Sequence, residues 1–407
     1  MTDNNSTQVC LARQPILNNN NQIVAFELLF RNSGDTEAKF TDGSLATAQV
    51  INNLLSNFGM NMLVGDKKAF INFDAHMLMS EMVDLLPKDK VVIEILETVK
   101  VTEQIIEKVK LLVSAGFTIA LDDFVDHKEF APLLPYASIM KIDISILTRD
   151  EIVSHTKLAQ QNNLQLLAER VETLEEYNDC VTMGFELFQG YYFAKPAHIE
   201  QKDIPAENMS IVKIMNLVMQ DADVTDIEHQ LSHSIGVSYK LLRYMNSAGM
   251  SRGKELDNIR DAIALLGARS LYKWLSLLLF TSSALPDDSS PALFSTALSR
   301  GSLLEALAKQ KGMQDTNEYF IVGMFSLLDV LLGVDFGHIF SQMIVPEPVK
   351  QVLINQSGPY APYMSIAKAL ENDDMSTVEQ YSHEINLSYD AILNAQIDSL
   401  KAQNELQ

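Results

Sequence analysis

The chain of 407 residues is long enough for two domains, each with its own buried core, and its composition is that of an ordinary globular protein. Its formal net charge of −22 excludes extensive non-specific nucleic-acid binding, which needs clustered lysine and arginine. Two cysteines without a CxxC motif argue against a structural disulfide and suit a reducing cytoplasm.

The sequence shows neither a signal peptide nor a membrane span. It begins with the polar stretch MTDNNSTQ. The longest apolar runs, residues 271–280 and 319–334, are shorter than the roughly 20 residues that cross a bilayer. We therefore predict that both runs are buried core helices, and that the protein is cytoplasmic with no membrane segment.

Apolar strand-like runs alternate with amphipathic helical stretches over residues 9–197. The runs lie at 24–30, 69–74, 91–96, 117–124, 138–145, 164–171 and 187–196. Continuous apolar runs are typical of parallel strands that helices cover on both faces. Strand, helix and strand at this spacing predict an α/β barrel of the TIM type. Because a complete barrel usually takes about 250 residues, we expect a shortened barrel in which some helices are short or missing.

A polar residue interrupts or ends every one of these runs. The set is Glu27, Asn72, Glu94, Asp122 with Asp123, Lys141, Glu169 and Gln189. Any single member could be a helix cap or a turn residue. Recurrence in every run favours a common site instead, because the carboxyl ends of barrel strands open onto one face. Carboxylate and amide oxygens are hard ligands that select Mg²⁺ or Mn²⁺.

The acidic and amide members of this set are candidate metal ligands. Glu27, Asn72, Glu94 and Asp122 could hold one ion, and Asp122 with Asp123 could bridge to a second. Two ions about 3.5–4 Å apart activate a water and stabilise the leaving oxygen in phosphodiester hydrolysis.

The remaining members are candidate catalytic residues. Lys141 could orient water or neutralise charge, Glu169 could be a ligand or the general base, and Gln189 could hydrogen-bond the attacking water. The alternatives left open are an ion pair of Lys141 with Asp143 or a neighbouring acid, a pairing of Glu169 with Arg170 at the barrel end, and an ordinary turn before Gly190 at Gln189.

After the polar linker 197–208 the pattern becomes all-helical. Leucine and methionine recur at i, i+3, i+4 and i+7 over 208–223, 224–235, 237–249 and 256–280, which predicts helices with buried apolar faces. We therefore place a barrel domain at 1–200 and an all-α domain at 201–407.

Eight short motifs occur in order along residues 9–197. They are QPI (14–16), FELLFR (26–31), INFD (71–74), IEILET (93–98), LDDF (121–124), KID (141–143), AERVET (168–173) and FQGYYFAKP (188–196). In this order they resemble the EAL family of cyclic-di-GMP phosphodiesterases. The resemblance implies a β/α barrel that hydrolyses cyclic di-GMP to pGpG with two Mg²⁺ or Mn²⁺ ions.

The resemblance also implies roles by position. Glu27, Asn72, Glu94 and Asp122 correspond to metal ligands, with Asp123 on the second ion. Lys141, Glu169 and Gln189 correspond to residues around the metals and the attacking water. Gln14 and Arg31 resemble substrate contacts, and the planar fork of Arg31 suits a phosphate.

Three departures from the family pattern bear on turnover. Leu28 stands where a small residue is usual, and Arg170 stands where the family motif has glycine. The glycine-rich loop after the paired aspartates reads DFVDHKEF (123–130) here. That loop helps to organise the second metal and the dimer contacts of the family, so its change bears on catalysis more than on binding.

The segments 231–250 and 259–280 resemble the HDOD domain, a helical relative of the HD phosphohydrolases. Where a catalytic HD domain has its His-Asp pair, this chain has Ser326 and Leu327. We therefore expect an interaction module for an unidentified protein partner, with no HD-type metal.

The sequence thus predicts a cyclic-di-GMP signalling protein that binds and could hydrolyse the dinucleotide. The alternative is an inactive EAL-like receptor or scaffold that regulates motility, pili or biofilm through protein contacts. A homodimer is left open.

Overall fold

The computed structural model describes residues 9–32, 60–122, 127–190, 203–247, 256, 258–282 and 290–406. The chain divides into two compact units. One comprises Met1–Ala197, Asp287–Ala292 and Ser365–Gln407, and the other comprises His198–Pro286 and Leu293–Met364. The predicted split at residue 200 assigns 365–407 to the helical domain, whereas the contacts group these residues with the barrel.

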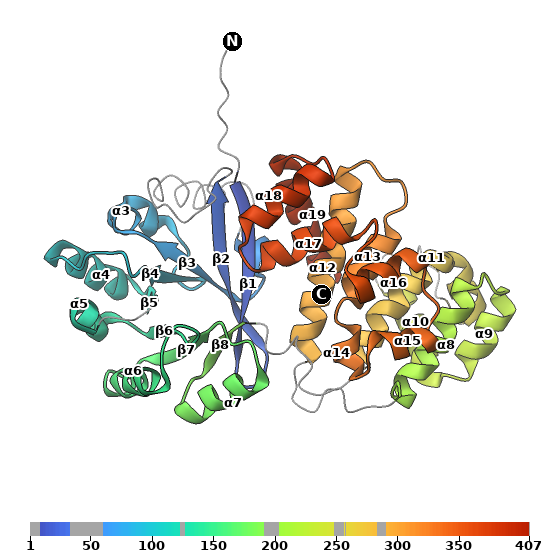
Figure 1. Cartoon of the computed structure of the whole chain (residues 1–407), viewed down its shortest axis with the longest axis horizontal. Coiled ribbons are helices and arrows are strands. Elements are labelled where there is room, and N and C mark those ends of the chain that lie inside the picture. Colours follow the sequence, from blue (N-terminus) through green and yellow to red (C-terminus); the bar gives the residue numbers. More distant parts are fainter. Residues whose placement is uncertain are drawn as a thin grey trace, which may run out of the picture. The chain divides into compact units, whose positions relative to one another are not determined.

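The first unit is built on a closed eight-stranded barrel (Figure 1), as predicted. Its strands are β1 (Val9–Asn18), β2 (Ile23–Asn32), β3 (Lys68–Phe73), β4 (Val91–Ile95), β5 (Thr118–Leu121), β6 (Ile139–Asp143), β7 (Gln165–Glu169) and β8 (Leu187–Gln189). Strands β2 to β8 run parallel to one another, and β1 is antiparallel to both β2 and β8. The barrel is therefore closed by one reversed strand.

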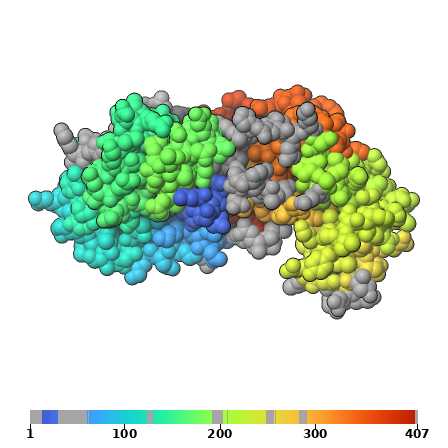
Figure 2. All heavy atoms as spheres, turned by 90° about the horizontal axis from the view of Figure 1, so that it is seen from below, coloured from blue at the N-terminus to red at the C-terminus, as the bar shows by residue number. Residues whose placement is uncertain are grey.

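Helices follow most of the parallel strands. They are α2 (Met60–Val64), α3 (Ala75–Met79), α4 (Glu103–Ala115), α5 (His127–Phe130), α6 (Arg149–Gln161) and α7 (Leu174–Met183), with 3-10 turns at Glu81–Leu85 and Ala131–Tyr136. Helix α3 has only five residues, in keeping with a shortened barrel, whereas α2 and α5 begin where the described residues begin. In Figure 2 the dark-blue end of the β1–β2 hairpin reaches the surface, where Tyr177 of α7 donates a hydrogen bond to the Asn19 carbonyl over 2.9 Å.

Local sequence signals set where these helices begin and end. Thr148 and Thr173 form capping boxes with Glu151 and Glu176 at the starts of α6 and α7. Gly116 ends α4 as its C-cap in the left-handed conformation, with φ 101°.

The barrel interior contains an apolar layer with one buried residue from each strand. The layer consists of Ile16, Ala25, Phe70, Val92, Ala120, Ile139, Leu167 and Leu187. Side chains alternate between the two faces of a strand, so the residues two positions further along point into the barrel as well. This periodicity fixes where a second inward layer must lie.

The second unit is all-helical, as predicted. Its helices are α8 (Ala206–Met219), α9 (Val224–Ser232), α10 (Ile235–Asn246), α11 (Ile259–Thr281), most of α12 (Ser290–Gln310), α13 (Asn317–Phe325), α14 (Leu328–Leu332), α15 (Phe336–Gln342), α16 (Glu347–Asn355) and the start of α17 (Ala361–Glu371). Gly267, with φ 76° and ψ 159°, kinks α11.

Helix α11 is long and apolar enough to cross a membrane by length and composition alone. Half of its most apolar stretch is buried within the structure. It packs against α8, α9, α10 and α13 of the helical unit. This packing agrees with the prediction of a buried core helix.

The C-terminal segment returns to the barrel unit. It comprises the second half of α17, then α18 (Met375–Glu384) and α19 (Tyr389–Leu406). Helix α19 packs against β1 and α2. Arg13 of β1 donates hydrogen bonds to Gln403 of α19 over 3.0 Å and to the Leu63 carbonyl over 2.8 Å, and it stacks on Phe26. Arg13 therefore links α19 to the barrel wall.

Candidate active site

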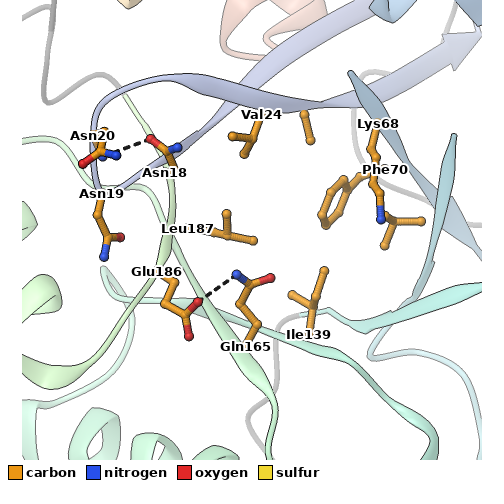
Figure 3. A pocket seen from close by; sticks show the side chains of 12 residues that line it. Asn18, Asn19, Asn20, Val24, Lys68, Phe70, Ile139, Gln165, Glu186 and Leu187 are labelled. Atoms are coloured by element: carbon orange, nitrogen blue, oxygen red, sulfur yellow. Dashed lines mark hydrogen bonds between the residues drawn. The ribbon is translucent and has the colours of Figure 1, made fainter. Parts of the chain in front are cut away.

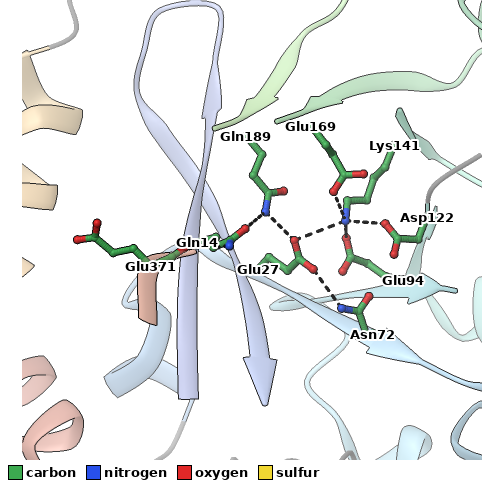
Figure 4. Close-up of polar contacts among 9 residues, drawn as sticks. All are labelled: Gln14, Glu27, Asn72, Glu94, Asp122, Lys141, Glu169, Gln189 and Glu371. Atoms are coloured by element: carbon green, nitrogen blue, oxygen red, sulfur yellow. Dashed lines mark hydrogen bonds and ion pairs between the residues drawn. The ribbon is translucent and has the colours of Figure 1, made fainter. Parts of the chain in front are cut away.

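A polar layer follows directly on the apolar layer of the barrel (Figure 4). Each member lies two residues beyond an apolar one, and on the reversed strand β1 this means two residues earlier in the chain. The layer consists of Gln14, Glu27, Asn72, Glu94, Asp122, Lys141, Glu169 and Gln189. The strand period therefore brings the predicted polar residues to one end of the barrel.

Lys141 is the centre of this layer. Its ammonium Nζ lies 2.7 Å from Asp122, 2.8 Å from Glu94, 2.9 Å from Glu169 and 3.5 Å from Glu27. The Lys141 side chain is only 1% exposed. A charge so buried is tolerable only among opposite charges, and the four carboxylates supply them.

Amide side chains complete the layer on the side of β1. Asn72 and Gln189 each donate a hydrogen bond to Glu27, over 3.0 and 2.7 Å. Gln189 also donates to Gln14, which sits opposite Glu27 in the β1–β2 register. Gln14 in turn donates to the backbone carbonyl of Glu371 over 2.9 Å. Figure 4 shows the Glu371 side chain pointing away from the layer.

Burial and neighbouring charge set the protonation of the acids. Burial, together with Glu27 and Asp122, raises the pKa of Glu94 well above its ordinary value. Burial raises the pKa of Glu169 to about 8 against the opposing charge of Lys141. For Glu27 burial acts in the same direction, but Lys141 and the amide hydrogen bonds outweigh it and lower the pKa. The layer thus holds four acids around one lysine, and two of them, Glu94 and Glu169, favour the protonated form.

The donor set fits divalent metal ions. Asn72 Oδ1, Glu94 Oε2 and Glu169 Oε2 are buried and accept no hydrogen bond. Buried polar atoms normally have a partner, and these are the hard oxygens that Mg²⁺ and Mn²⁺ prefer. In the described ranges no three His, Cys, Asp or Glu side chains form a ready metal cluster, and the Lys141 ammonium lies where the acids converge. The unpartnered oxygens are therefore the atoms that suit a cation.

Lys141 pairs with neighbouring acids, as its alternative allowed, but not with Asp143, and the alternative pair of Glu169 with Arg170 does not form. Lys141 pairs with the four acids of the layer, while Asp143 accepts from Arg170 over 3.1 Å and from Ser145. Glu169 pairs with Lys141 and not with Arg170.

Two predicted residues are outside what the structure describes. Asp123, with the loop 123–126, lies outside the described residues. Arg31 lies on β2 opposite Cys10, but its side chain is not among the described ones.

A cavity of about 520 Å³ opens over the polar layer. It is lined by Gln14, Glu27, Glu169, Arg170, Asn372 and Asp373, among others. Arg170 has a left-handed backbone with φ 54°, the conformation that a glycine adopts without strain. Asn372 and Asp373 belong to the turn between α17 and α18, and no sequence motif connects this turn with the barrel.

A second cavity, of about 490 Å³, lies at the other end of the strands (Figure 3). Its walls combine apolar residues such as Phe70, Val92 and Ile139 with polar ones such as Asn18, Asn19 and Lys68. The polar contact between Gln165 and Glu186 closes one side over 3.0 Å. Its lining contains none of the residues of the polar layer.

The chain matches the EAL domain family over residues 3–196 and the HDOD domain family over residues 204–358. It belongs to the family of proteins that join an EAL domain to an HDOD domain.

Two relatives match nearly end to end. The cyclic di-GMP phosphodiesterase CdgJ of Vibrio cholerae is 31% identical over 404 residues, which cover 97% of this chain and 92% of that protein. The uncharacterized protein YuxH of Bacillus subtilis is 30% identical over 397 residues, which cover 95% of this chain and 97% of that protein. Among solved structures, a manganese and cyclic-di-GMP complex of BlrP1 from Klebsiella pneumoniae is 22% identical with a TM-score of 0.39, covering 47% of this chain and 57% of that one.

Proposed function

We propose that the barrel is a metal-dependent phosphodiesterase that hydrolyses cyclic di-GMP to linear pGpG. The observation that carries the proposal is the complete polar layer, with buried, unpartnered oxygens on Asn72, Glu94 and Glu169. The end-to-end relative CdgJ is itself described as a cyclic di-GMP phosphodiesterase. Hydrolysis adds water across one P–O bond, leaving a 5′-phosphate and a free 3′-hydroxyl.

The residues take distinct roles in this proposal. Mg²⁺ or Mn²⁺, when bound, lowers the pKa of a water and neutralises developing charge. Glu27, Asn72, Glu94, Asp122 and Asp123 would hold the ions.

The other members of the layer act on water and substrate. Glu169, whose pKa is raised to about 8, would take the proton of the water in its ionised form, the share of which increases as the pH rises toward 8. Lys141 holds the acids in place and supplies fixed positive charge. Gln189 and Gln14 position the substrate beside Glu27.

The helical unit supports a separate role as a binding module. Ser326, at one position of the absent HD pair, accepts from Arg300 over 3.0 Å and donates to the Gly323 carbonyl. Leu327, at the other, is buried. We propose that this unit binds a protein partner, that the protein acts in the cytoplasm, and that a homodimer is compatible with both roles.

A receptor without turnover is the second candidate function. Arg170 carries a left-handed backbone where the family motif has glycine, lines the cavity and pairs with Asp143. A guanidinium there can retain an anionic product or substrate.

The test is incubation of the full chain with cyclic di-GMP and Mg²⁺ or Mn²⁺, followed by chromatography for pGpG. An enzyme forms product, and Glu27→Ala abolishes it while Glu186→Ala, at the other end of the barrel, does not. Tight binding without product selects the receptor. Absence of both binding and product contradicts the two proposals together.

A further inference from the structure

The C-terminal segment supplies one wall of the catalytic cavity. Asn372 and Asp373, in the turn between α17 and α18, line the same cavity as Glu27 and Glu169. This turn is outside the residues that match either domain family, since the HDOD match ends at 358. This wall of the cavity therefore comes from a part of the chain outside both matched domains.

The turn is fixed to the polar layer by hydrogen bonds. Gln14 donates a hydrogen bond to the Glu371 carbonyl. The side-chain oxygen of Gln14 accepts a hydrogen bond from Gln189, and Gln189 also donates one to Glu27. Three hydrogen bonds thus join the turn to a proposed metal ligand. Further along the segment, Gln403 of α19 is buried and accepts from Arg13. Gln14 consequently holds the turn at the cavity, and Arg13 attaches the same C-terminal segment to β1 at a second place.

Backbone conformation also fixes the position of Asp373. Its φ is 56°, in the left-handed region that aspartate and asparagine tolerate better than other side chains. The next residue, Asp374, caps α18 by accepting from the Thr377 backbone over 3.1 Å. The half-buried Asp373 is thereby presented at the cavity wall by a turn with little freedom.

The charge of the wall decides which part of a dinucleotide it can contact. The cavity lining already includes Glu27, Glu169 and Glu172, and Arg170 is its only cationic residue among those described. A further carboxylate would repel a phosphate. It matches the guanine edge instead, because N1–H and the N2 amine are both donors and a carboxylate is an acceptor only.

We propose that the turn Glu371–Asp373 is part of the substrate site and that Asp373 contacts the guanine edge of the dinucleotide. The inference rests on the proposed function, because it takes cyclic di-GMP as the ligand. It makes the C-terminal segment a determinant of base specificity, supplied from outside the EAL domain.

The experiment measures the ligand affinity of Asp373→Asn and of the wild-type chain by calorimetric titration in CaCl₂. Chromatography of the same samples detects any turnover of the ligand. Asparagine keeps the shape and the left-handed backbone but removes the charge. The control Asp398→Asn removes the same charge from an exposed position on α19. The ligands are cyclic di-GMP and cyclic di-IMP, whose base lacks the N2 amine. Thermal unfolding verifies that each variant is folded.

We expect Asp373→Asn to weaken cyclic di-GMP binding about tenfold, as the loss of a charged hydrogen bond implies, and to weaken cyclic di-IMP binding less. Asp398→Asn should bind both as the wild type does. Unchanged affinity in Asp373→Asn, or an equal loss for both ligands, overturns the inference and leaves the proposed function intact. If the wild-type chain binds neither ligand, the proposed function fails and the inference fails with it.

Discussion

At the scale of single residues, Lys141 is the group on which the polar layer depends. Four carboxylates within 3.5 Å raise its pKa well above the ordinary value, although burial alone would lower it. Removing one partner of a buried ion pair leaves the other charges uncompensated, which is far more damaging than exchanging the whole group. The lysine thus has a structural role as well as a chemical one.

Lys141→Met should therefore destabilise the barrel unit by about 3–5 kcal/mol. Urea unfolding at pH 8, followed by circular dichroism, measures the change in the free energy of unfolding. The exposed Lys157→Met on α6 is the control and should change it by less than about 0.5 kcal/mol. Equal stability of Lys141→Met and the wild type would mean that the acids do not depend on this charge.

Cys180 on α7 is a thiol whose reactivity is suppressed by the fold. Burial, with smaller contributions from Asp179 and Glu176, raises the pKa of its thiol to about 12. Since the thiolate is the nucleophile, we expect alkylation of native Cys180 at pH 8 to be about a thousandfold slower than that of an ordinary thiol.

The measurement uses a Cys10→Ser background, so that Cys180 is the single thiol, and follows iodoacetamide labelling by mass. Labelling should become rapid in urea, which provides the internal control. Fast labelling of the folded protein would contradict the buried placement.

At the scale of elements, strands β2 to β8 could be predicted because their apolar runs are nearly continuous and polar residues recur in or at the end of each. Strand β1 was not named as a strand, since Arg13, Gln14 and Pro15 interrupt its apolar pattern. The site membership of Gln14 could be inferred only from the family resemblance. Its place in the layer depends on the reversed direction of β1, which periodicity does not report.

Helix boundaries likewise cannot be predicted from periodicity alone. The stretch 256–280 has one helical period, yet Gly267 kinks α11 in its first half. The stretch 319–334 is one apolar run, but it forms the two helices α13 and α14. Period alone cannot locate such breaks, because neighbouring helices determine which residues must turn inward.

The crossing of α12 and α13 depends on two glycines. A Cβ at Gly323 would lie 2.3 Å from the backbone nitrogen of Gly301, well inside contact distance. Gly323→Ala should therefore force the helices apart and destabilise the helical unit by about 1–3 kcal/mol or more.

The single tryptophan, Trp274 on α11, lies in the helical unit and reports its unfolding by fluorescence. Gly236→Ala on α10 is the matched control, because no atom lies within 4 Å of its added Cβ. The control should be neutral or stabilising by up to about 1 kcal/mol. A Gly323→Ala protein as stable as the wild type would rule out the close crossing.

At the scale of the whole molecule, sequence patterns could place two domains but not the return of the C-terminal segment. The contacts that attach it to the barrel join residues 357 and 390 positions apart, Gln14 with Glu371 and Arg13 with Gln403. An amphipathic helix such as α19 has an apolar face in any setting, and its periodicity does not identify the surface that it covers. Only the folded structure shows that this surface is β1.

This attachment predicts that a fragment of residues 1–200 is less stable than the barrel of the full chain. Without the segment, β1 loses its cover, and Ile392, Ala395 and Leu400 of α19 are no longer buried. Burial of one aliphatic side chain is worth about 1.5–3 kcal/mol, so the loss should reach at least about 3 kcal/mol. The residues 1–200 contain no tryptophan, and urea unfolding is therefore followed by circular dichroism.

A peptide of residues 365–407 added in trans should restore part of the lost stability, whereas the same peptide with Gln403→Ala should restore less. If the fragment is as stable as the barrel of the full chain, or if the peptide does not change its stability, the segment does not stabilise the barrel.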